Sequence, residues 1–479
     1  MLFNSVKFFI FLIPVYLVYL RLNHRWQNRF LLLASYVFYA SWDWRFLSLI
    51  LIATAVDYFC GIKISRSNDP VVRKRFLILS ICSGLTILGF FKYFNFFTTN
   101  IERLLGVFGI DADPFHFNII LPVGISFYTF QAMSYTIDVY RKAVKHTDNF
   151  ADFALYVAFF PQLVAGPIER AKNLLPQVIN SRKFRLDQFY EGCFLIFWGL
   201  FLKAVIADNL GKLVEPVYAV TVPPFNGMEV LFATYAFTFQ IYCDFAGYSH
   251  IARGLGKIMG FELMVNFNLP FFVTNIQDYW NKWHISLSTW LRDYLYIPLF
   301  SGLRFLKGNS RIFAALMITM TLIGLWHGAG WNYIIFGVYY GLLLCCYVLI
   351  RVHCLNWINP KSRWGQALWF AARLVFMFHL VVIGMLLFRS VNGMAVAVCM
   401  LQALFTDFTM TENVVPILSK LVYFTWILLA VQIWQYRTND LMAVYKAQPM
   451  FKVIFYAICL FYFSVYGVTN GNQFIYFQF

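Results

Sequence analysis

Charged residues are scarce in this chain: Asp, Glu, Lys and Arg together make up 13% of its 479 residues. Soluble domains usually carry about 25%. Hydrophobic residues account for 61% of the chain and aromatic residues for 20%, and the mean hydropathy is +0.65. These values exclude an ordinary soluble domain and predict a polytopic membrane protein.

Acidic residues are scarcer than basic ones, with 22 Asp and Glu against 38 Lys and Arg, which gives a formal net charge of +16. In a membrane protein, excess Lys and Arg marks cytoplasmic loops and contacts with anionic lipid headgroups. No basic patch here is joined to a recognisable nucleic-acid-binding module. We therefore expect membrane lipid among the partners and no nucleic acid.

Repeats, low-complexity linkers and cysteine motifs are also absent from the sequence. The nine cysteines lie mostly inside apolar runs and form no C-x-x-C spacing, which argues against a disulfide framework and favours small buried packing residues. No linker or fixed-period repeat separates domains. We therefore expect one membrane-embedded domain over residues 1–479.

Twelve apolar runs suit the roughly 20 residues that cross a bilayer core, some of them as shorter crossings. They lie near 5–21, 30–42, 46–62, 76–97, 119–138, 190–209, 229–248, 312–326, 333–350, 366–388, 418–435 and 450–468. The first run is too long for a typical signal peptide and lacks an A-x-A cleavage pattern, so we expect it to stay as an uncleaved span.

The loops after the first, third and fifth of these spans are basic, and basic loops face the cytoplasm. This pattern predicts that both termini are extracytoplasmic and that His327 lies at the outer end of a short span. Three further apolar pieces, at 155–170, 267–300 and 394–405, do not fit as complete crossings. Broken by proline and glycine or by charge, they favour re-entrant or interfacial helices.

The segment TLIGLWHGAGWNYIIFG, residues 321–337, places His327 in very apolar surroundings. An ionisable side chain at the centre of a membrane helix costs about 2.5–3.5 kcal/mol or more, so its presence suggests a function. An interhelical hydrogen bond is the structural alternative. Gly328 and Gly330 would let backbone and substrate approach the ring, and Asn332 could orient a bound group.

A second histidine, His284, lies in FNLPFFVTNIQDYWNKWHISLSTWLRDYLYIPLF, residues 267–300, which we expect on the cytoplasmic side. On a helix, the aromatic residues of this segment would share related faces: Tyr279, Trp283, Trp290 and Tyr294. No carboxylate or cysteine lies at ligand spacing from His284 or His327, so we expect no metal site.

The motif DYWNKWHISLSTWLRDYLYIPL, followed some forty residues later by GLWHGAGWNYIIFG, resembles the paired signature of the membrane-bound O-acyltransferase family. PVGISFYTFQAMSYTIDVYR (122–141), FPQLVAGPIER (160–170), YCDFAGYSHIARGLGKIMGF (242–261) and the ending FIYFQF are similar to its branch of bacterial alginate O-acetylase membrane subunits. The resemblance covers nearly the whole chain.

The resemblance implies an all-α fold, a ring of about 12 transmembrane helices with re-entrant or interfacial helices around a central tunnel. The catalytic core would lie at about 119–350, between peripheral spans at 1–100 and 366–479. The resemblance also assigns the family's essential histidine to His327 and the second residue of the family's motif to His284. An imidazole with a pKa of about 6.5 can take a proton from an acceptor hydroxyl near neutral pH.

The same resemblance implies an enzyme of the bacterial inner membrane that transfers an acetyl group from a cytoplasmic thioester. This thioester would be either acetyl-CoA or a carrier-protein thioester. No cofactor is expected to stay bound. The acceptor would be a hydroxyl of an extracytoplasmic polysaccharide, either an alginate-like exopolysaccharide or a cell-wall glycan. Transfer would be direct or through a periplasmic partner similar to SGNH-type or alginate-acetylase proteins.

Residues expected to contact the substrate or line the tunnel are Trp283, Trp326, Asn332, Asp244, Gly328 and Gly330. Asp244 is a charge inside an apolar run, and structural pairing and tunnel lining both stay open for it. His250 and Arg253 could meet a phosphate of the donor, although anchoring at the cytoplasmic face explains Arg253 equally well.

Two alternative functions remain at this stage. One is D-alanyl transfer of the teichoic-acid type, because the central block is shared with that relative. The other is transport of a polysaccharide or lipid-linked sugar, although secondary transporters often show matching inverted halves and this chain does not.

The C-terminal NGNQFIYFQF alternates with a period of two, which predicts an extended tail. An apolar extended segment left in water would be an aggregation hazard. We expect it to be covered by the protein's own outer rim or by a partner.

Overall fold

A computed structural model describes residues 1–110, 117–353, 360–468 and 474–475. Within these ranges every regular element is an α-helix or a short 3₁₀- or π-helix, and no strand is present. The expected all-α fold is confirmed. The chain divides into two compact units, and the helices α10 (Leu186–Phe201) and α12 (Gly227–Ile258) each run from one unit into the other.

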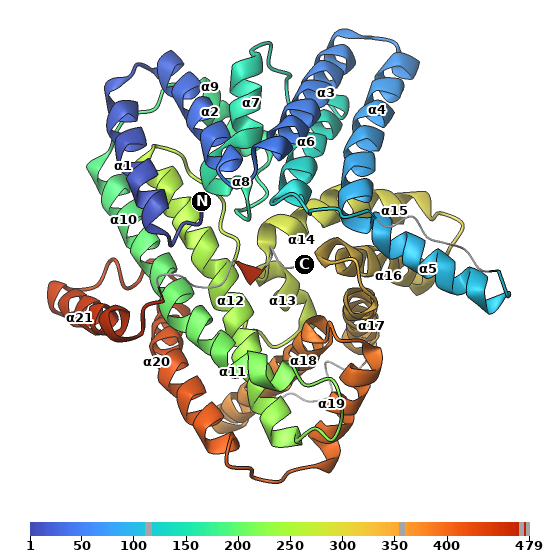
Figure 1. The fold of residues 1–479 in the computed structure, drawn as a ribbon, viewed down its shortest axis with the longest axis vertical. Helices are drawn as coiled ribbons and strands as arrows, with labels where there is room; N and C mark the ends of the chain where they lie inside the picture. The colour runs from blue at the N-terminus through green and yellow to red at the C-terminus, as the bar shows by residue number, and fades with distance from the viewer. Residues whose placement is uncertain (111–116, 354–359, 469–473, 476–479) are drawn as a thin grey trace. The chain divides into compact units, whose positions relative to one another are not determined.

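Unit 1 comprises residues 1–197 and 248–264. Its helices, besides parts of α10 and α12, are α1 (Val6–Arg21), α2 (His24–Ala40), α3 (Leu47–Arg66), α4 (Pro70–Leu88), α5 (Phe94–Val107), α6 (Ile125–Tyr140), α7 (Phe150–Ala158), α8 (Phe160–Leu163) and α9 (Ala171–Ile179). α3, α4 and α6 pack side by side (Figure 1). Side-chain caps begin several of these helices; Asn23, for example, accepts a hydrogen bond from the backbone N–H of Trp26 at 3.2 Å.

The core of unit 1 includes α6, α7 and α8, in which most side chains are buried. Gly124 precedes α6 with φ +76°, and a Cβ there would lie 2.6 Å from the Leu163 carbonyl oxygen, so only glycine fits. The predicted broken segment 155–170 is divided between α7 and α8. Pro161 lies in the first turn of α8, where its missing N–H costs no helical hydrogen bond.

Unit 2 comprises residues 198–247 and 265–479. Its helices, besides parts of α10 and α12, are a π-helix (Leu202–Ala207), α11 (Asp208–Tyr218), α13 (Ile276–Lys282), α14 (Ile285–Leu291), a π-helix (Arg292–Tyr296), α15 (Ile297–Gly302), α16 (Gly308–His327), α17 (Trp331–His353), α18 (Arg363–Arg389), α19 (Met394–Thr406), α20 (Val414–Thr438) and α21 (Pro449–Tyr466). α16 and α17 form a hairpin (Figure 1). The hairpin packs closely because a Cβ at Gly324 or Gly337 would overlap backbone atoms of the other helix.

Eight helical segments of the described residues are long and apolar enough to cross a membrane, which supports a multi-pass membrane protein. They are Trp44–Arg66, Pro70–Val107, Leu186–Tyr218, Gly308–His327, Trp331–Arg351, Arg363–Arg389, Val414–Thr438 and Pro449–Tyr466. Each coincides with one of the twelve predicted spans. The other four predictions fall on α1, α2 and α6, which have 16, 17 and 16 residues, and on the more polar α12, so twelve crossings are not confirmed.

Candidate active site

His327 is the last residue of α16, and Gly328 is its C-cap. The imidazole is only 3% exposed and lies among aromatic rings. Its ring centroid lies 5.0 Å from that of Trp326, 5.7 Å from that of Phe336 and 5.3 Å from that of Phe388. α17 and α18 therefore supply an apolar wall around a titratable group at the end of a membrane-spanning helix.

The glycine residues after His327 are closely surrounded by neighbouring side chains. A Cβ at Gly328 would overlap the ring of Tyr333, and one at Gly330 would lie 2.6 Å from Asn332 Oδ1. Asn332 Nδ2 donates a hydrogen bond to the Phe388 carbonyl oxygen at 3.0 Å. These contacts fasten the start of α17 to the end of α18. Substrate contact by Gly328, Gly330 and Asn332 stays a prediction.

His284 interrupts the segment 267–300, so the prediction of a helix carrying its aromatic residues on related faces is wrong at this position. α13 ends at Lys282, Trp283 is its C-cap, and His284 has φ +43° and ψ +54°, a left-handed conformation that is uncommon for a residue other than glycine. α14 begins directly afterwards. His284 therefore lies at the break between the two helices and belongs to neither of them.

Asn266 holds this break in place. Its Oδ1 atom accepts hydrogen bonds from the Ser286 N–H at 3.2 Å and the Ser286 hydroxyl at 2.9 Å, and it lies 3.2 Å from His284 Nδ1. The Asn266 backbone carbonyl accepts from the Ile285 N–H at 2.9 Å. Because Asn266 Oδ1 is an acceptor, the shared proton belongs on Nδ1, and Nε2 carries the lone pair.

The His284 ring has no exposed surface and packs edge-on against Phe245, with centroids 4.6 Å apart. His284 lies outside the eight candidate spans. Burial lowers the pKa of His284 to about 3, because the charged imidazolium is poorly solvated there. The ring is therefore neutral near neutral pH and is suited to orient a group by hydrogen bonding rather than by charge.

Trp326 connects the two histidines. Its ring centroid lies 5.8 Å from that of His284 and 5.0 Å from that of His327, so a single indole contacts both imidazoles. Trp283 is buried, stacks on Tyr279 with centroids 5.6 Å apart and contacts Phe267 at 5.0 Å. The sequence placed the two histidines on opposite sides of a thin centre, and the structure brings both to one aromatic ring.

Asp244 takes part in a buried ion cluster. Lys203 Nζ lies 2.5 Å from Asp244 Oδ1 and 2.8 Å from Asp208 Oδ1, and all three side chains are at most 5% exposed. Asp244 Oδ2 accepts a hydrogen bond from the Ile475 N–H at 2.7 Å. These partners explain Asp244 structurally. The sequence analysis missed Lys203, although a lysine inside the predicted span 190–209 was a visible signal.

The described part of the tail is covered by the chain itself. Phe474 and Ile475 are buried, and Lys203 Nζ lies 4.8 Å from the centre of the Phe474 ring. Val468 N–H donates to the Ala204 carbonyl oxygen at 3.1 Å. Residues 469–473 and 476–479 lie outside the described residues, so the extended conformation predicted for the whole tail stays a prediction.

His250 and Arg253 belong to unit 1, and contact with a donor phosphate stays a prediction for both. His379 lies on α18, where its Nε2 is 2.6 Å from the Tyr235 hydroxyl and its Nδ1 is 2.8 Å from the Val375 carbonyl oxygen. It is hydrogen-bonded and lies on the exposed face of the helix.

Sequence reasoning missed Asn266, Tyr333 and Phe388 at the site. Asn266 had no local signal, because its importance comes from a backbone break 18 residues further along the chain. Phe388 had none either, since an aromatic residue near the end of an apolar span is common. Tyr333 lies within the quoted segment 321–337 but was given no role, and its ring explains why Gly328 must lack a side chain.

Three named bacterial proteins are similar to this chain over more than half of its length. A probable alginate O-acetylase AlgI of Pseudomonas aeruginosa is 40% identical over 85% of this chain and 75% of its own length. A peptidoglycan O-acetyltransferase of Helicobacter pylori is 33% identical over 72% of this chain and 70% of its own length. A teichoic acid D-alanyltransferase of Bacillus subtilis is 29% identical over 57% of this chain and 70% of its own length.

The family model of the membrane-bound O-acyltransferases matches residues 138–390, a range that includes both His284 and His327. It also includes Asn266, Trp326 and the end of α18 that contacts His327. Together with relatives that carry acetyl and D-alanyl transfer in their names, this match decides against a transporter. The chain is an acyltransferase and belongs to the membrane-bound O-acyltransferase family.

Proposed function

We propose that this acyltransferase moves an acetyl group from a cytoplasmic thioester, acetyl-CoA, to a hydroxyl on the outer side of the bacterial inner membrane. The acceptor is an alginate-like exopolysaccharide or a cell-wall glycan, reached directly or through a periplasmic partner of SGNH or alginate-acetylase type. Both termini are extracytoplasmic in this proposal. The observation that supports it best is the single indole of Trp326 in contact with both His284 and His327.

The proposed reaction transfers the acetyl group from the sulfur atom of a thioester to the oxygen atom of the acceptor hydroxyl. His327 takes the proton of the acceptor hydroxyl while that oxygen attacks the thioester carbonyl carbon. The C–S bond breaks, an oxygen ester forms, and the thiolate leaving group receives a proton to give free thiol. The apolar wall of Phe336 and Phe388 keeps water from competing with the acceptor, since hydrolysis would waste the donor.

In this proposal His284 is a positioning residue. The Asn266 hydrogen bonds hold its neutral ring in one orientation beside Trp326. Nε2 can then accept a hydrogen bond from an N–H or O–H of the acyl donor or of the acyl acceptor. No net charge is brought to the site by this residue. The alternative donor is a D-alanyl carrier-protein thioester, which the Bacillus subtilis relative makes worth testing.

The test uses purified full-length protein in sealed vesicles supplied with acetyl-CoA labelled in the acetyl group. We expect release of free CoA thiol and appearance of labelled ester on an added uronate-rich or glycan acceptor, or on a co-reconstituted periplasmic partner. A D-alanyl carrier thioester serves as the competing donor. Consumption of the D-alanyl donor alone would contradict acetyl transfer and favour the alternative.

The direction of transfer predicts the membrane sides of two exposed positions. Gln277 on α13 and Ala329 beside His327 are exposed, unlike the buried Ser286 and Asn332 close to them. In a chain whose native cysteines are replaced, we expect Gln277→Cys to react with an impermeant maleimide only in inverted vesicles and Ala329→Cys only in intact spheroplasts. Reaction of both from the same face would rule out transfer across the membrane.

A further inference from the structure

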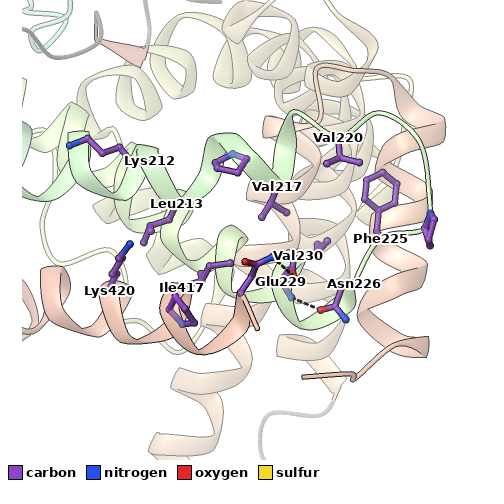
Figure 2. A pocket seen from close by; sticks show the side chains of 14 residues that line it. Lys212, Leu213, Val217, Val220, Phe225, Asn226, Glu229, Val230, Ile417 and Lys420 are labelled. Carbon is purple, nitrogen blue, oxygen red and sulfur yellow. Dashed lines mark hydrogen bonds between the residues drawn. The ribbon is translucent and has the colours of Figure 1, made fainter. Parts of the chain in front are cut away.

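A pocket of about 430 Å³ opens in unit 2 between α11, the start of α12 and the start of α20 (Figure 2). Apolar side chains such as Leu213, Val217 and Ile417 form part of its walls, and polar side chains such as Asn226 and Asn413 form the rest. Lys212 and Lys420 also line it, and Figure 2 shows both at the same end, away from Val220 and Phe225. The pocket therefore combines an apolar surface with two positive charges.

Neither lysine forms a direct ion pair within the described part of the chain. Lys212 Nζ donates a hydrogen bond to Asn209 Oδ1 at 3.0 Å, and no carboxylate lies within ion-pair distance of Lys212 or Lys420. The acidic residue of the pocket is Glu229, and its Oε1 atom already accepts hydrogen bonds from the Thr411 hydroxyl and from Asn413 Nδ2. The lining residues therefore carry two positive charges against the single negative charge of Glu229, and this net positive charge favours an anionic ligand.

The position of the lysines along their helices indicates the depth of that ligand. Lys212 lies six residues before the end of α11, and Lys420 lies six residues after the start of α20. At 1.5 Å per residue, each is about 9 Å inside its helix end. Both helices belong to candidate spans, and a lysine side chain about two turns from a helix end is long enough to extend toward the headgroups and water.

The same end of unit 2 carries His327. Phe388, which packs against the His327 ring, is followed by Arg389, whose Nη2 donates to Glu215 Oε1 on α11 at 2.9 Å. Asn392 Nδ2 donates to the Tyr218 carbonyl oxygen at the end of α11 at 2.8 Å. The α11 wall of the pocket and the apolar wall of the active site are therefore joined through the end of α18.

We propose that this pocket binds a phospholipid of the surrounding bilayer, with the lipid phosphate between Lys212 and Lys420 and the glycerol and upper acyl chains against the apolar wall. α20 presents exposed apolar side chains beside the pocket, including Val415 at 61% and Val422 at 56% exposure, as a lipid-facing helix does. A bound lipid would fill the space between α11 and α20 and stabilise the end of α18 that supports His327. The proposal does not depend on which acyl donor the enzyme uses.

The test is a lipid titration of delipidated full-length protein in detergent, followed by native mass spectrometry. We expect dioleoylphosphatidylglycerol to bind saturably, and the double variant Lys212→Gln, Lys420→Gln to bind it roughly tenfold more weakly, which corresponds to about 1.4 kcal/mol. The control is Lys307→Gln, Lys361→Gln, which removes two exposed lysines of the same unit outside the pocket and should bind like wild type.

Two further arms make the result decisive. The charge-retaining pair Lys212→Arg, Lys420→Arg should keep wild-type affinity even if the glutamine pair folds poorly, and loss of binding there would contradict the proposal. Dioleoylglycerol, which lacks a phosphate, should not bind saturably, and equal binding would overturn the phosphate contact. Displacement of the phospholipid by millimolar inorganic phosphate would instead identify a soluble phosphate site and overturn the lipid source.

Discussion

Replacing His327 with glutamine should lower the rate of ester formation by about 10²–10⁴, the usual contribution of a general base. Glutamine approximates the size and hydrogen bonding of the imidazole, so the ring contacts with Trp326, Phe336 and Phe388 are largely replaced by amide contacts. The loss should therefore appear in turnover and not in protein accumulation. His327→Ala should be at least as inactive, but it also leaves a cavity at a site that is 3% exposed.

The matched control is His379→Gln. His379 is a histidine on a membrane-spanning helix of the same unit, with hydrogen bonds to Tyr235 and Val375 and no contact with the His284–Trp326–His327 cluster. Esterification per molecule of protein should stay near the wild-type rate in this variant. The measurement is O-acetyl ester content of the acceptor, normalised to membrane-inserted protein. Turnover near wild type in His327→Gln would disprove its role as the base.

Replacing Lys203 with methionine should strongly destabilise the protein. The change leaves the carboxylates of Asp208 and Asp244 buried together without the cation that lies 2.8 Å and 2.5 Å from them. Breaking a buried ion pair by removing one partner typically costs about 3–5 kcal/mol, because the remaining charge is poorly solvated. We expect lower accumulation and a lower thermal unfolding midpoint in detergent, together with faster proteolysis of the tail that Asp244 holds through Ile475.

The control here is Lys446→Met. Lys446 pairs with Asp440 at 2.7 Å, but its side chain is 60% exposed, and exposed pairs contribute only about 0–1 kcal/mol. Adding Asp208→Asn and Asp244→Asn to Lys203→Met removes both uncompensated charges and should restore part of the lost stability. If Lys203→Met unfolded at the same temperature as Lys446→Met, the buried cluster would not contribute as we infer.

Composition and short motifs were enough to assign this chain to a class of membrane proteins. Its low charge and high hydropathy exclude a soluble fold, and eight of its predicted spans coincide with helices long enough to cross a membrane. The paired histidine motifs predicted the family that the match over residues 138–390 confirms. These features are readable because they are local, since an apolar run of about 20 residues or a short motif carries its meaning without reference to distant segments.

The contacts between these elements could be learned from the folded chain alone. The helix break at His284 is held by Asn266, the Asp244 charge is balanced by Lys203 of another helix, and one indole joins His284 to His327. The pattern of 267–300 predicted re-entrant or interfacial helices but not the break at His284, because the hydrogen bonds that hold the break come from Asn266, outside the segment. Partners of a buried polar group are chosen by packing between distant parts of the chain, and that choice leaves no mark in local sequence.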